Sequence, residues 1–374
     1  MAKRKGKSRQ RIDWHARYEA GDDDSPDHKS KGKLTKRQVK LPPRDLEAGR
    51  ENIDDLPRLE GMVVGMFPGG AEVRIGGSVM LCMIAKAFRA PAGSTALAVG
   101  DTVTVAASRR EHHDASGDDP DRADGMILSR GPRETALSRP APRSGKRSDE
   151  YKTEVFERVI AANMDVLLIV AATRQPPLRK RLIQRYLIIA ERGEMEPILV
   201  LNKIDLAPAD PEVLDHFRQS ELLIVEVSAS TGQGVEELSS HLANRRSILA
   251  GASGVGKSTL INRLVPGADL PTRTVRPGDQ RGRHTTSSAS VYELPGGGML
   301  VDTPGIRELG LPIEPAQLPW YFPEFERFTP NCKFNNCTHT HEPHCAVIQA
   351  VEDGIIGADR FETYLQLLST LDET

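Results

Sequence analysis

The sequence contains one segment whose glycine spacing is typical of a phosphate-binding loop. Residues 251–258 match the pattern G-x-x-x-x-G-K-[ST], with an apolar strand expected before them and an apolar helix after them. Gly251 and Gly256 allow backbone N–H groups to converge on phosphate oxygens at a helix N-terminus. Lys257 would neutralise charge on the terminal phosphates, and the hydroxyl of Ser258 would ligate Mg²⁺. We expect the nucleotide to contact the whole loop, namely Gly251, Ala252, Ser253, Gly254, Val255, Gly256, Lys257, Ser258 and Thr259.

Two further motifs indicate that the bound base is guanine. Asn202, Lys203 and Asp205 form an N-K-x-D motif at the end of an apolar strand. The carboxylate of Asp205 can accept two hydrogen bonds from the N1 and N2 edge of guanine, which adenine does not offer, and an unfilled polar site rejects the wrong base. The next expected strand ends at Ser228, where the Ala229 N–H could meet guanine O6. Taken alone, N-K-x-D also fits an ordinary turn, so the prediction depends on its combination with the phosphate loop.

A third apolar strand ends in a D-x-x-G motif at residues 302–305. Asp302 would hold Mg²⁺ through water, and the Gly305 N–H would sense the γ-phosphate. Thr285 and Thr286 lie between the phosphate loop and this motif, and they supply hydroxyls for a switch segment that contacts Mg²⁺. The sequence leaves open which of the two threonines is the ligand.

Three of the four cysteines lie close together near the C-terminus, interleaved with histidines. In a reducing compartment such a cluster favours metal over disulfide, and three thiolates with one imidazole suit a closed tetrahedral structural zinc site. Reduced cysteines in a loop are the alternative. The candidate ligands are Cys332, Cys337 and Cys345, with a fourth ligand from His339, His341 or His344. Cys82 lies apart in an expected strand, where a buried free thiol is common.

Short β-like runs separated by glycine, proline and acidic residues come after the N-terminal segment. Five such strands within some eighty residues suit a small closed β-barrel. The OB-fold is the commonest barrel of this size that binds nucleic acid, although an SH3-like barrel would give much the same pattern. The expected strands are Gly61–Met66, Ala71–Ile75, Val79–Ala85, Asp101–Ala106 and Gly125–Leu128.

After a polar stretch at residues 140–152, apolar strands alternate with helices. This alternation predicts a parallel sheet that is covered on both faces. The expected strands are Asp165–Ala171, Pro197–Asn202, Leu222–Ser228 and Arg246–Ala250. The expected helices are Leu178–Glu191, Pro211–Gln219, Gly234–Ala243 and Lys257–Leu264. The last sixty or so residues are rich in proline, aromatic residues, cysteine and histidine, and they end in an expected helix, Arg360–Leu371.

Composition places limits on the class of protein. A chain of 374 residues with 38% apolar content can form two or three domains. The longest apolar run, Val166–Ala172, is too short to cross a bilayer, which needs about 20 residues, so we expect a cytoplasmic protein. Net charge is −2, but residues 1–40 hold 13 Lys or Arg against 6 Asp or Glu. Such a basic arm suits nucleic acid, although a solvated tail without a partner is the alternative.

The motifs occur in a rotated order. In an ordinary small GTPase the phosphate loop comes first, whereas here N-K-x-D and S-A-S precede the phosphate loop, the switch threonines and D-x-x-G, so the domain is circularly permuted. This order, with a barrel before it and a Cys/His cluster after it, resembles the RsgA (YjeQ) family of ribosome-small-subunit-dependent GTPases over roughly residues 55 to 370. Family-like strings are Leu137-Ser-Arg-Pro140, Ile160-Ala-Ala-Asn163, Gly254-Val-Gly-Lys-Ser258, Gly282-Arg-His-Thr-Thr286 and Phe322-Pro-Glu-Phe325.

The resemblance implies an OB-fold that contacts ribosomal RNA and a GTPase that assists late maturation of the small subunit, with GTP hydrolysis stimulated by that subunit. It implies Mg²⁺ with GTP and one structural Zn²⁺, and it selects His339 as the fourth zinc ligand. Ile306 occupies the position where many GTPases use Gln to orient water, and His284 is the family-like replacement. We expect a monomer, because no coiled-coil or symmetric apolar segment calls for an oligomer.

These observations predict a multidomain protein. Its expected parts are a basic tail with little fixed structure (1–52), an OB-fold β-barrel (53–139), a linker (140–152), a circularly permuted P-loop α/β GTPase domain (153–311) and a mainly helical zinc-binding domain (312–374). Two other functions are compatible with parts of the pattern. One is an RNA-binding scaffold whose nucleotide site does not turn over, and the other is a P-loop kinase or ATPase, against which the N-K-x-D motif argues.

Overall fold

The computed structural model describes residues 56–90, 95–107, 124–140, 157–218, 222–270, 289–303, 306 and 309–372. The predicted basic tail, nearly all of the predicted linker and the switch segment with His284, Thr285 and Thr286 lie outside these residues, as does Gly305. Among the helices in the described ranges, none is long and apolar enough to cross a membrane.

The N-terminal part of the described chain is a closed five-stranded barrel with the strand order β1-β2-β3-β5-β4. Strands β3 and β5 run parallel, while the other neighbouring pairs are antiparallel. Val63, Val105 and Ile127 are fully buried inside it, as alternation along half-buried strands requires. The predicted OB-like barrel is therefore confirmed. The strands are β1 (Arg58–Phe67), β2 (Gly70–Ile75), β3 (Ser78–Ile84), β4 (Thr102–Ala107) and β5 (Gly125–Arg130).

Cys82 lies inside this barrel and is fully buried. Burial, assisted by the nearby carboxylate of Asp124, raises the pKa of its thiol to about 12. A thiol with so high a pKa stays protonated and unreactive, so Cys82 serves the packing of the barrel.

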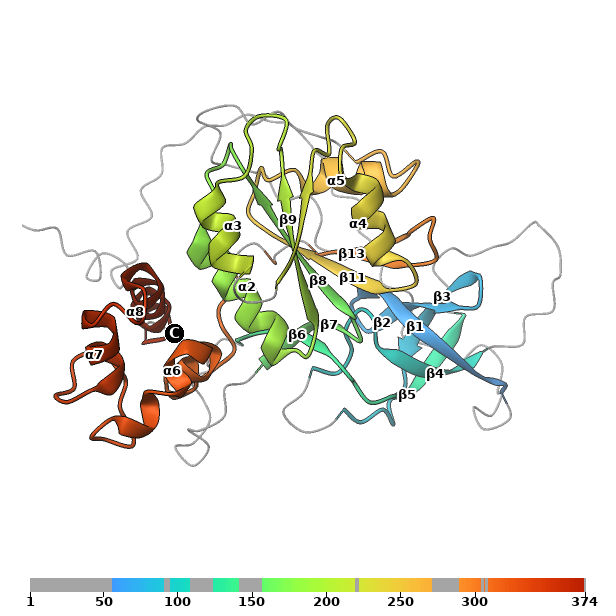
Figure 1. Ribbon diagram of the computed structural model, residues 1–374. Coiled ribbons are helices and arrows are strands. Elements are labelled where there is room, and N and C mark those ends of the chain that lie inside the picture. Colours follow the sequence, from blue (N-terminus) through green and yellow to red (C-terminus); the bar gives the residue numbers. More distant parts are fainter. Residues whose placement is uncertain are drawn as a thin grey trace, which may run out of the picture. The chain divides into compact units, whose positions relative to one another are not determined.

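The central domain is a six-stranded sheet with the order β10-β9-β8-β11-β13-β12. All neighbouring pairs are parallel except β12 with β13 at one edge. Helices α2 and α3 lie on one face of the sheet and α4 and α5 on the other (Figure 1). The strands are β8 (Val166–Ala172), β9 (Glu196–Asn202), β10 (Leu223–Val227), β11 (Arg246–Ala250), β12 (Ser290–Glu293) and β13 (Met299–Asp302). The helices are α2 (Lys180–Arg192), α3 (Pro211–Arg218), α4 (Val235–Leu242) and α5 (Lys257–Leu264).

Because helices cover both faces, the inner strands are apolar along their whole length. Every residue of β8 is buried, and its odd and even positions belong to two separate clusters on opposite faces of the sheet. The predicted parallel α/β domain is thus confirmed, and β8 pairs directly with β11 although the two strands lie far apart in sequence.

An antiparallel pair that the sequence pattern did not indicate joins the barrel to this sheet. It consists of β6 (Ala136–Pro140) and β7 (Glu157–Ala162). Leu137 and Ala161 pack into the cluster that also contains Tyr186 of α2. The predicted domain boundaries nearby stay predictions.

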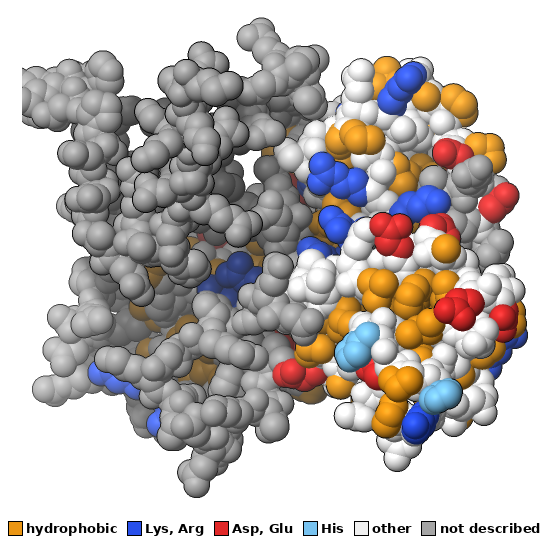
Figure 2. Space-filling model, turned by 90° about the vertical axis from the view of Figure 1, so that its left-hand side faces the viewer, with side chains coloured by type: hydrophobic (Ala, Val, Ile, Leu, Met, Phe, Trp, Pro, Cys, Tyr) orange, Lys and Arg blue, Asp and Glu red, His pale blue; other side chains and the backbone are white. Residues whose placement is uncertain are grey.

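The C-terminal part is mainly helical, and its core is aromatic. The rings of Phe322 and Phe325 pack against Tyr364 with centroid separations of 5.2 and 5.0 Å. Hydrophobic side chains also reach the surface between charged ones (Figure 2), and Trp320 is 72% exposed. The elements are η4 (Pro315–Tyr321), α6 (Pro323–Glu326), η5 (Thr329–Asn331), α7 (Ala346–Glu352) and α8 (Ala358–Asp372).

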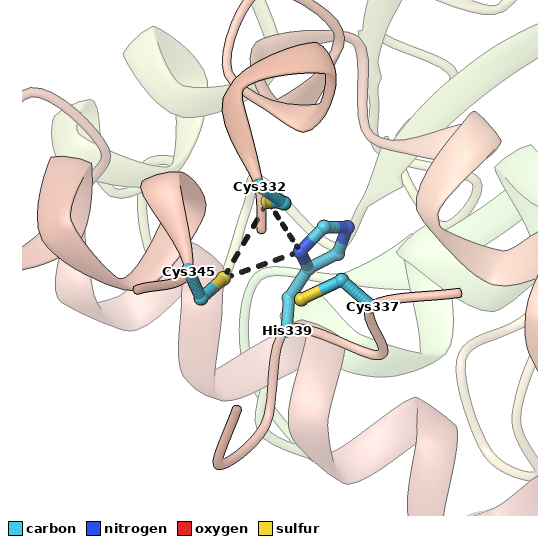
Figure 3. A group of neighbouring side chains, drawn as sticks. All are labelled: Cys332, Cys337, His339 and Cys345. Carbon is cyan, nitrogen blue, oxygen red and sulfur yellow. Dashed lines mark hydrogen bonds between the residues drawn. The ribbon is translucent and has the colours of Figure 1, made fainter. Parts of the chain in front are cut away.

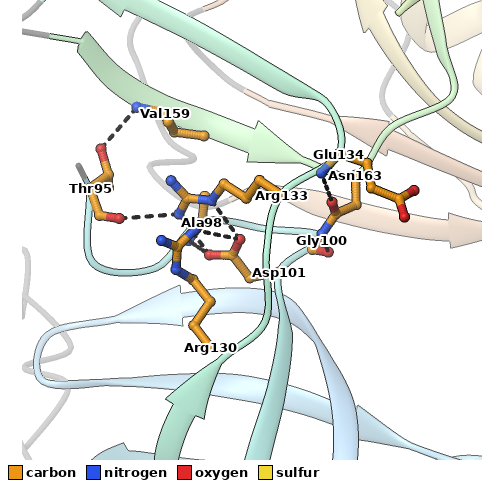
Figure 4. A network of polar contacts seen from close by, with 9 residues as sticks. All are labelled: Thr95, Ala98, Gly100, Asp101, Arg130, Arg133, Glu134, Val159 and Asn163. Atoms are coloured by element: carbon orange, nitrogen blue, oxygen red, sulfur yellow. Dashed lines mark hydrogen bonds and ion pairs between the residues drawn. The ribbon is translucent and has the colours of Figure 1, made fainter. Parts of the chain in front are cut away.

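A buried ion pair closes the end of the barrel that faces the central domain (Figure 4). Asp101 is fully buried, and its two carboxylate oxygens accept hydrogen bonds from Nε and Nη2 of Arg133 at 2.7 and 2.8 Å. One of them also accepts the Ala98 N–H at 2.7 Å, and Arg130 lies 3.7 Å away. Burial, together with repulsion from Arg133, lowers the pKa of Arg130, while Asp101 opposes that shift. The carboxylate therefore neutralises two largely buried cations.

Asn163, in the turn between β7 and β8, extends this network into the central domain. Its Nδ2 donates to the carbonyl of Gly100 at 3.0 Å, and its Oδ1 accepts the Glu134 N–H at 2.9 Å. The Ala162 N–H donates to the Val99 carbonyl at 2.8 Å. Side-chain and backbone bonds thus fix the end of the barrel against the β7–β8 turn.

We predict that Asp101→Asn destabilises this junction by about 3 kcal/mol, because breaking a buried pair leaves the arginine charges uncompensated. Hydrogen–deuterium exchange of residues 96–107 should become faster in the variant. Glu196→Gln is the matched control: Glu196 pairs with Arg245 at an exposed site, and such pairs contribute about 1 kcal/mol or less. Equal exchange in the two variants would contradict the assigned role of Asp101.

Candidate functional site

Four predicted motifs lie after strands that end at the same edge of the sheet. N-K-x-D begins at the last residue of β9 and D-x-x-G at the last residue of β13, while S-A-S follows β10 and the phosphate loop follows β11. These strands are mutually parallel, so their carboxyl ends meet at one edge, where open α/β sheets bind ligands. The fold brings the motifs together in spite of their rotated order.

The phosphate loop depends on two glycines with left-handed backbone conformations. Gly251 has φ +147°, and a Cβ there would lie 2.3 Å from the Val170 carbonyl oxygen. Gly256 has φ +99°, and a Cβ there would lie 2.3 Å from Nδ2 of Asn202. Lys257 curls back over the loop and donates to the carbonyl of Gly251 at 2.8 Å. The loop therefore has the compact shape that brings backbone N–H groups to the start of α5.

The side chain of Asn202 joins three of the loops. It is almost fully buried, and its Nδ2 donates to the Val255 carbonyl at 2.8 Å. Its Oδ1 accepts the backbone N–H groups of Lys203 at 2.8 Å and Ala229 at 3.0 Å. The predicted Ala229 donor is thus present at the site but is engaged by Asn202, so a base that bonds to it must share or replace that bond.

Lys203 and Asp205 lie beside the hydrogen bonds made by Asn202. The Nζ of Lys203 donates to the Gly254 carbonyl at 2.7 Å, and burial lowers its pKa against the opposing effect of Asp205. Asp205 is exposed and accepts the Ser228 hydroxyl at 2.6 Å. That hydrogen bond lowers the pKa of Asp205, which keeps the group an ionised acceptor. Lys203 therefore braces the phosphate loop, while Asp205 presents a carboxylate toward solvent at the same edge.

The D-x-x-G motif lies beside the phosphate loop. Strand β13 pairs with β11 so that Val301 is opposite Ile248, which puts Asp302 next to the end of β11. Ile306 is buried in the core, and its carbonyl accepts the hydroxyl of Tyr186 at 3.0 Å. A side chain packed in this way is not available to orient water. The candidate switch residues are outside the described part of the chain.

The Cys/His cluster also forms (Figure 3). One ligand atom from each of four side chains lies within 4.8 Å of the others, and these side chains are Cys332, Cys337, His339 and Cys345. His339 turns its Nδ1 toward the sulfurs, 3.3 Å from Sγ of Cys345 and 3.6 Å from Sγ of Cys332. Burial lowers the pKa of His339, which favours the neutral imidazole that a metal needs. Three thiolates and one imidazole could hold a zinc ion.

Glu342 shapes the loop that carries His339. Its carboxylate accepts the backbone N–H groups of Thr338 at 2.7 Å and Thr340 at 3.0 Å, and the Thr338 hydroxyl at 2.6 Å. Burial opposes ionisation, but these hydrogen bonds prevail and hold the pKa of Glu342 far below its usual range. Sequence reasoning missed this residue, because nothing in its spacing distinguishes it from a surface acid.

A second group that the sequence did not reveal holds the S-A-S loop. Arg263, in the last turn of α5, donates from Nε to the Ala229 carbonyl at 3.0 Å and from Nη2 to the Ser230 carbonyl at 2.6 Å. No local pattern marks it, since α5 and the loop after β10 meet only in the folded chain.

Comparison with known proteins identifies the family. Residues 131–312 match the sequence model of the RsgA GTPase family. Small ribosomal subunit biogenesis GTPase RsgA of Chlorobaculum parvum is 43% identical over 284 residues, which are 75% of this chain and 87% of that protein. The chain belongs to the RsgA GTPase family. The protein of the same name from Shewanella oneidensis is 34% identical over 358 residues, 92% of this chain and 94% of its own. The family resemblance predicted from the motif order is confirmed.

Solved structures agree with the RsgA fold. The crystal structure of YjeQ from Thermotoga maritima aligns with a TM-score of 0.58 and 31% identity, over 84% of this chain and 99% of that one. The structure of YloQ, described as a circularly permuted GTPase, aligns with a TM-score of 0.57 over 85% of this chain and 96% of that one. At 24% identity it shows the fold alone. The circular permutation described for YloQ agrees with the rotated order of motifs in this chain.

If the cluster holds zinc, the purified protein should contain about one zinc ion per chain, and His339→Ala should lose it, because a structural site requires its full ligand set. Elemental analysis measures the metal. His341→Ala and His344→Ala are matched controls, since neither histidine belongs to the cluster, and both should retain it. Zinc retained by His339→Ala and lost from His344→Ala would reverse the assignment.

Proposed function

We propose that this chain is a GTPase that binds the small ribosomal subunit and assists its late maturation. Relatives that carry the name small ribosomal subunit biogenesis GTPase support the proposal. The observation that carries it is the tie made by Asn202, which joins the expected guanine motif to the expected phosphate loop at 2.8 Å. That contact gives the two motifs one geometry, as a single bound nucleotide requires.

In this proposal each motif keeps the role expected from its chemistry. Asp205 and the Ala229 N–H read guanine, while the loop from Gly251 to Thr259 surrounds the phosphates, assisted by the Gly305 N–H. Ser258, Asp302 and one of the two switch threonines, Thr285 or Thr286, bind Mg²⁺. His284 positions the attacking water. The burial of Ile306 supports the last assignment, because the position that carries Gln in many GTPases points into the core.

We further propose that the barrel contacts ribosomal RNA, and that the Cys/His cluster holds one structural zinc ion in a protein that acts as a cytoplasmic monomer. Docking would reach the nucleotide through the segment after D-x-x-G, which continues from Ile306 into the C-terminal part. Tyr186 of α2 holds that segment at 3.0 Å, and Gln184 of the same helix accepts a hydrogen bond from Arg360 of α8. Helix α2 thus contacts both Ile306 and the C-terminal helix α8.

Single-turnover hydrolysis of GTP tests the proposal. We expect slow hydrolysis by the chain alone and faster hydrolysis with purified small subunits, measured by phosphate release. His284→Ala should lower the stimulated rate by about 100-fold, in the range of general acid–base catalysis. GTP binding without hydrolysis, both in the absence and in the presence of small subunits, would identify a binding scaffold. An unchanged stimulated rate in His284→Ala would exclude that residue from the chemistry.

Asp205→Asn should weaken GTP binding by at least about 100-fold and improve binding of xanthosine triphosphate, because the amide presents a donor where xanthine has a carbonyl. Competition against a fluorescent guanine nucleotide measures both affinities. Asp215→Asn, the same change at an exposed position of the following helix, should leave both unchanged. GTP affinity retained in Asp205→Asn would refute the base-recognition role.

A further inference from the structure

The loop expected to contact guanine is held from outside by one guanidinium group. Arg263 donates from Nε to the Ala229 carbonyl at 3.0 Å and from Nη2 to the Ser230 carbonyl at 2.6 Å. Its two donors thus span neighbouring peptide units. A guanidinium presents donors in a rigid fork and can make both bonds at once, whereas an ammonium is a point donor.

The opposite side of the same loop carries the groups of the base site. The Ala229 N–H faces Oδ1 of Asn202 at 3.0 Å, and the Ser228 hydroxyl donates to Asp205 at 2.6 Å. A backbone bond from the Gly232 N–H to the Ser228 carbonyl at 2.8 Å closes the loop on itself. Arg263 and Asn202 therefore attach Ala229 to two different parts of the chain, through its carbonyl and its N–H respectively.

Helix α5 connects the loop that Arg263 holds to the phosphate loop. The helix begins at Lys257, directly after the phosphate loop, and Arg263 lies six residues later in its last turn. At 1.5 Å per residue the two positions are separated by about 9 Å along the helix axis. One short helix therefore contacts the expected phosphate site at its start and the expected base site at its end.

We propose that Arg263 is a positioning residue for guanine recognition, which holds the S-A-S loop so that Ala229 and Asp205 meet the base. The inference rests on the proposed function, because it presupposes that the site binds a guanine nucleotide. In this proposal Arg263 acts through the loop, by its bonds to the Ala229 and Ser230 carbonyls, and has no part in contacting the nucleotide itself. Loss of its bonds should therefore weaken base recognition and leave phosphate binding intact.

The test compares GDP and inorganic pyrophosphate, both in competition with ribose-labelled fluorescent GDP on the full-length chain. Arg263→Met should bind GDP about tenfold more weakly and release it faster. The variant loses two charge-assisted hydrogen bonds, and at an exposed site their contribution to the binding free energy is at the low end of the usual range. Arg263→Lys should be intermediate, since it can keep one bond. Pyrophosphate affinity and the thermal unfolding midpoint without nucleotide should not change in either variant.

Arg192→Met is the matched control. Arg192 is the basic residue in the last turn of α2, as Arg263 is in α5, and it pairs with Glu157 at 2.7 Å. The control removes a cation from a helix C-terminus without touching the S-A-S loop and should bind GDP like the wild type. GDP affinity unchanged in Arg263→Met would overturn the inference, as would equal losses for GDP and pyrophosphate. A wild-type chain that binds no guanine nucleotide would instead refute the proposed function.

Discussion

The geometry of the expected nucleotide site depends on the carboxamide of Asn202. One side chain supplies a donor to the Val255 carbonyl and an acceptor to the N–H groups of Lys203 and Ala229, so three loops share a single buried group. An unpaired donor or acceptor in such a position costs about 1–3 kcal/mol, which favours the arrangement in which all three loops are in place. The close approach of Gly256 to Asn202 adds a steric constraint, because a Cβ would lie 2.3 Å from Nδ2.

This constraint explains why the order of motifs along the chain can change while the site stays the same. Parallel strands bring their carboxyl ends to one edge whichever strand comes first, and Asn202 then fixes the loops to one another. Permutation does change the segment to which the D-x-x-G strand is connected. Here the chain runs past Ile306, held by Tyr186 of α2, into the part that contains the Cys/His cluster. A displacement of Ile306 would therefore reach α2 and the C-terminal part directly.

The sequence predicted those features whose cause is local. The phosphate loop, the strands and helices around it and the Cys/His cluster arise from short patterns, and the barrel strands arise from alternation between turn residues. Contacts between distant segments left no pattern. Strands β6 and β7 are short and pair across a long separation, while Arg263 and Glu342 act through backbone groups that any residue could supply. The hydrogen bond from the Ala229 N–H to Asn202 was not predicted either, because it also joins segments that are distant in sequence.

The charged pair at the junction of the barrel with the central domain contributes more to orientation than to stability. Burying Asp101 with Arg133 carries a desolvation cost that apolar packing of similar volume would avoid, so stability alone does not account for the pair. The bidentate contact instead fixes the segment after β5 against the start of β4, and so shapes the end of the barrel that Asn163 contacts. Gly100 permits the close approach of this end of the barrel to β7, since its φ is +90° and a Cβ would lie 2.0 Å from the Ala162 carbonyl oxygen. That carbonyl precedes the turn into β8. Strand β8 pairs with β11, which leads directly into the phosphate loop. A ligand that binds the barrel would thus act on a part of the chain that is bonded to the β7–β8 turn, and β8 lies next to the strand before the phosphate loop.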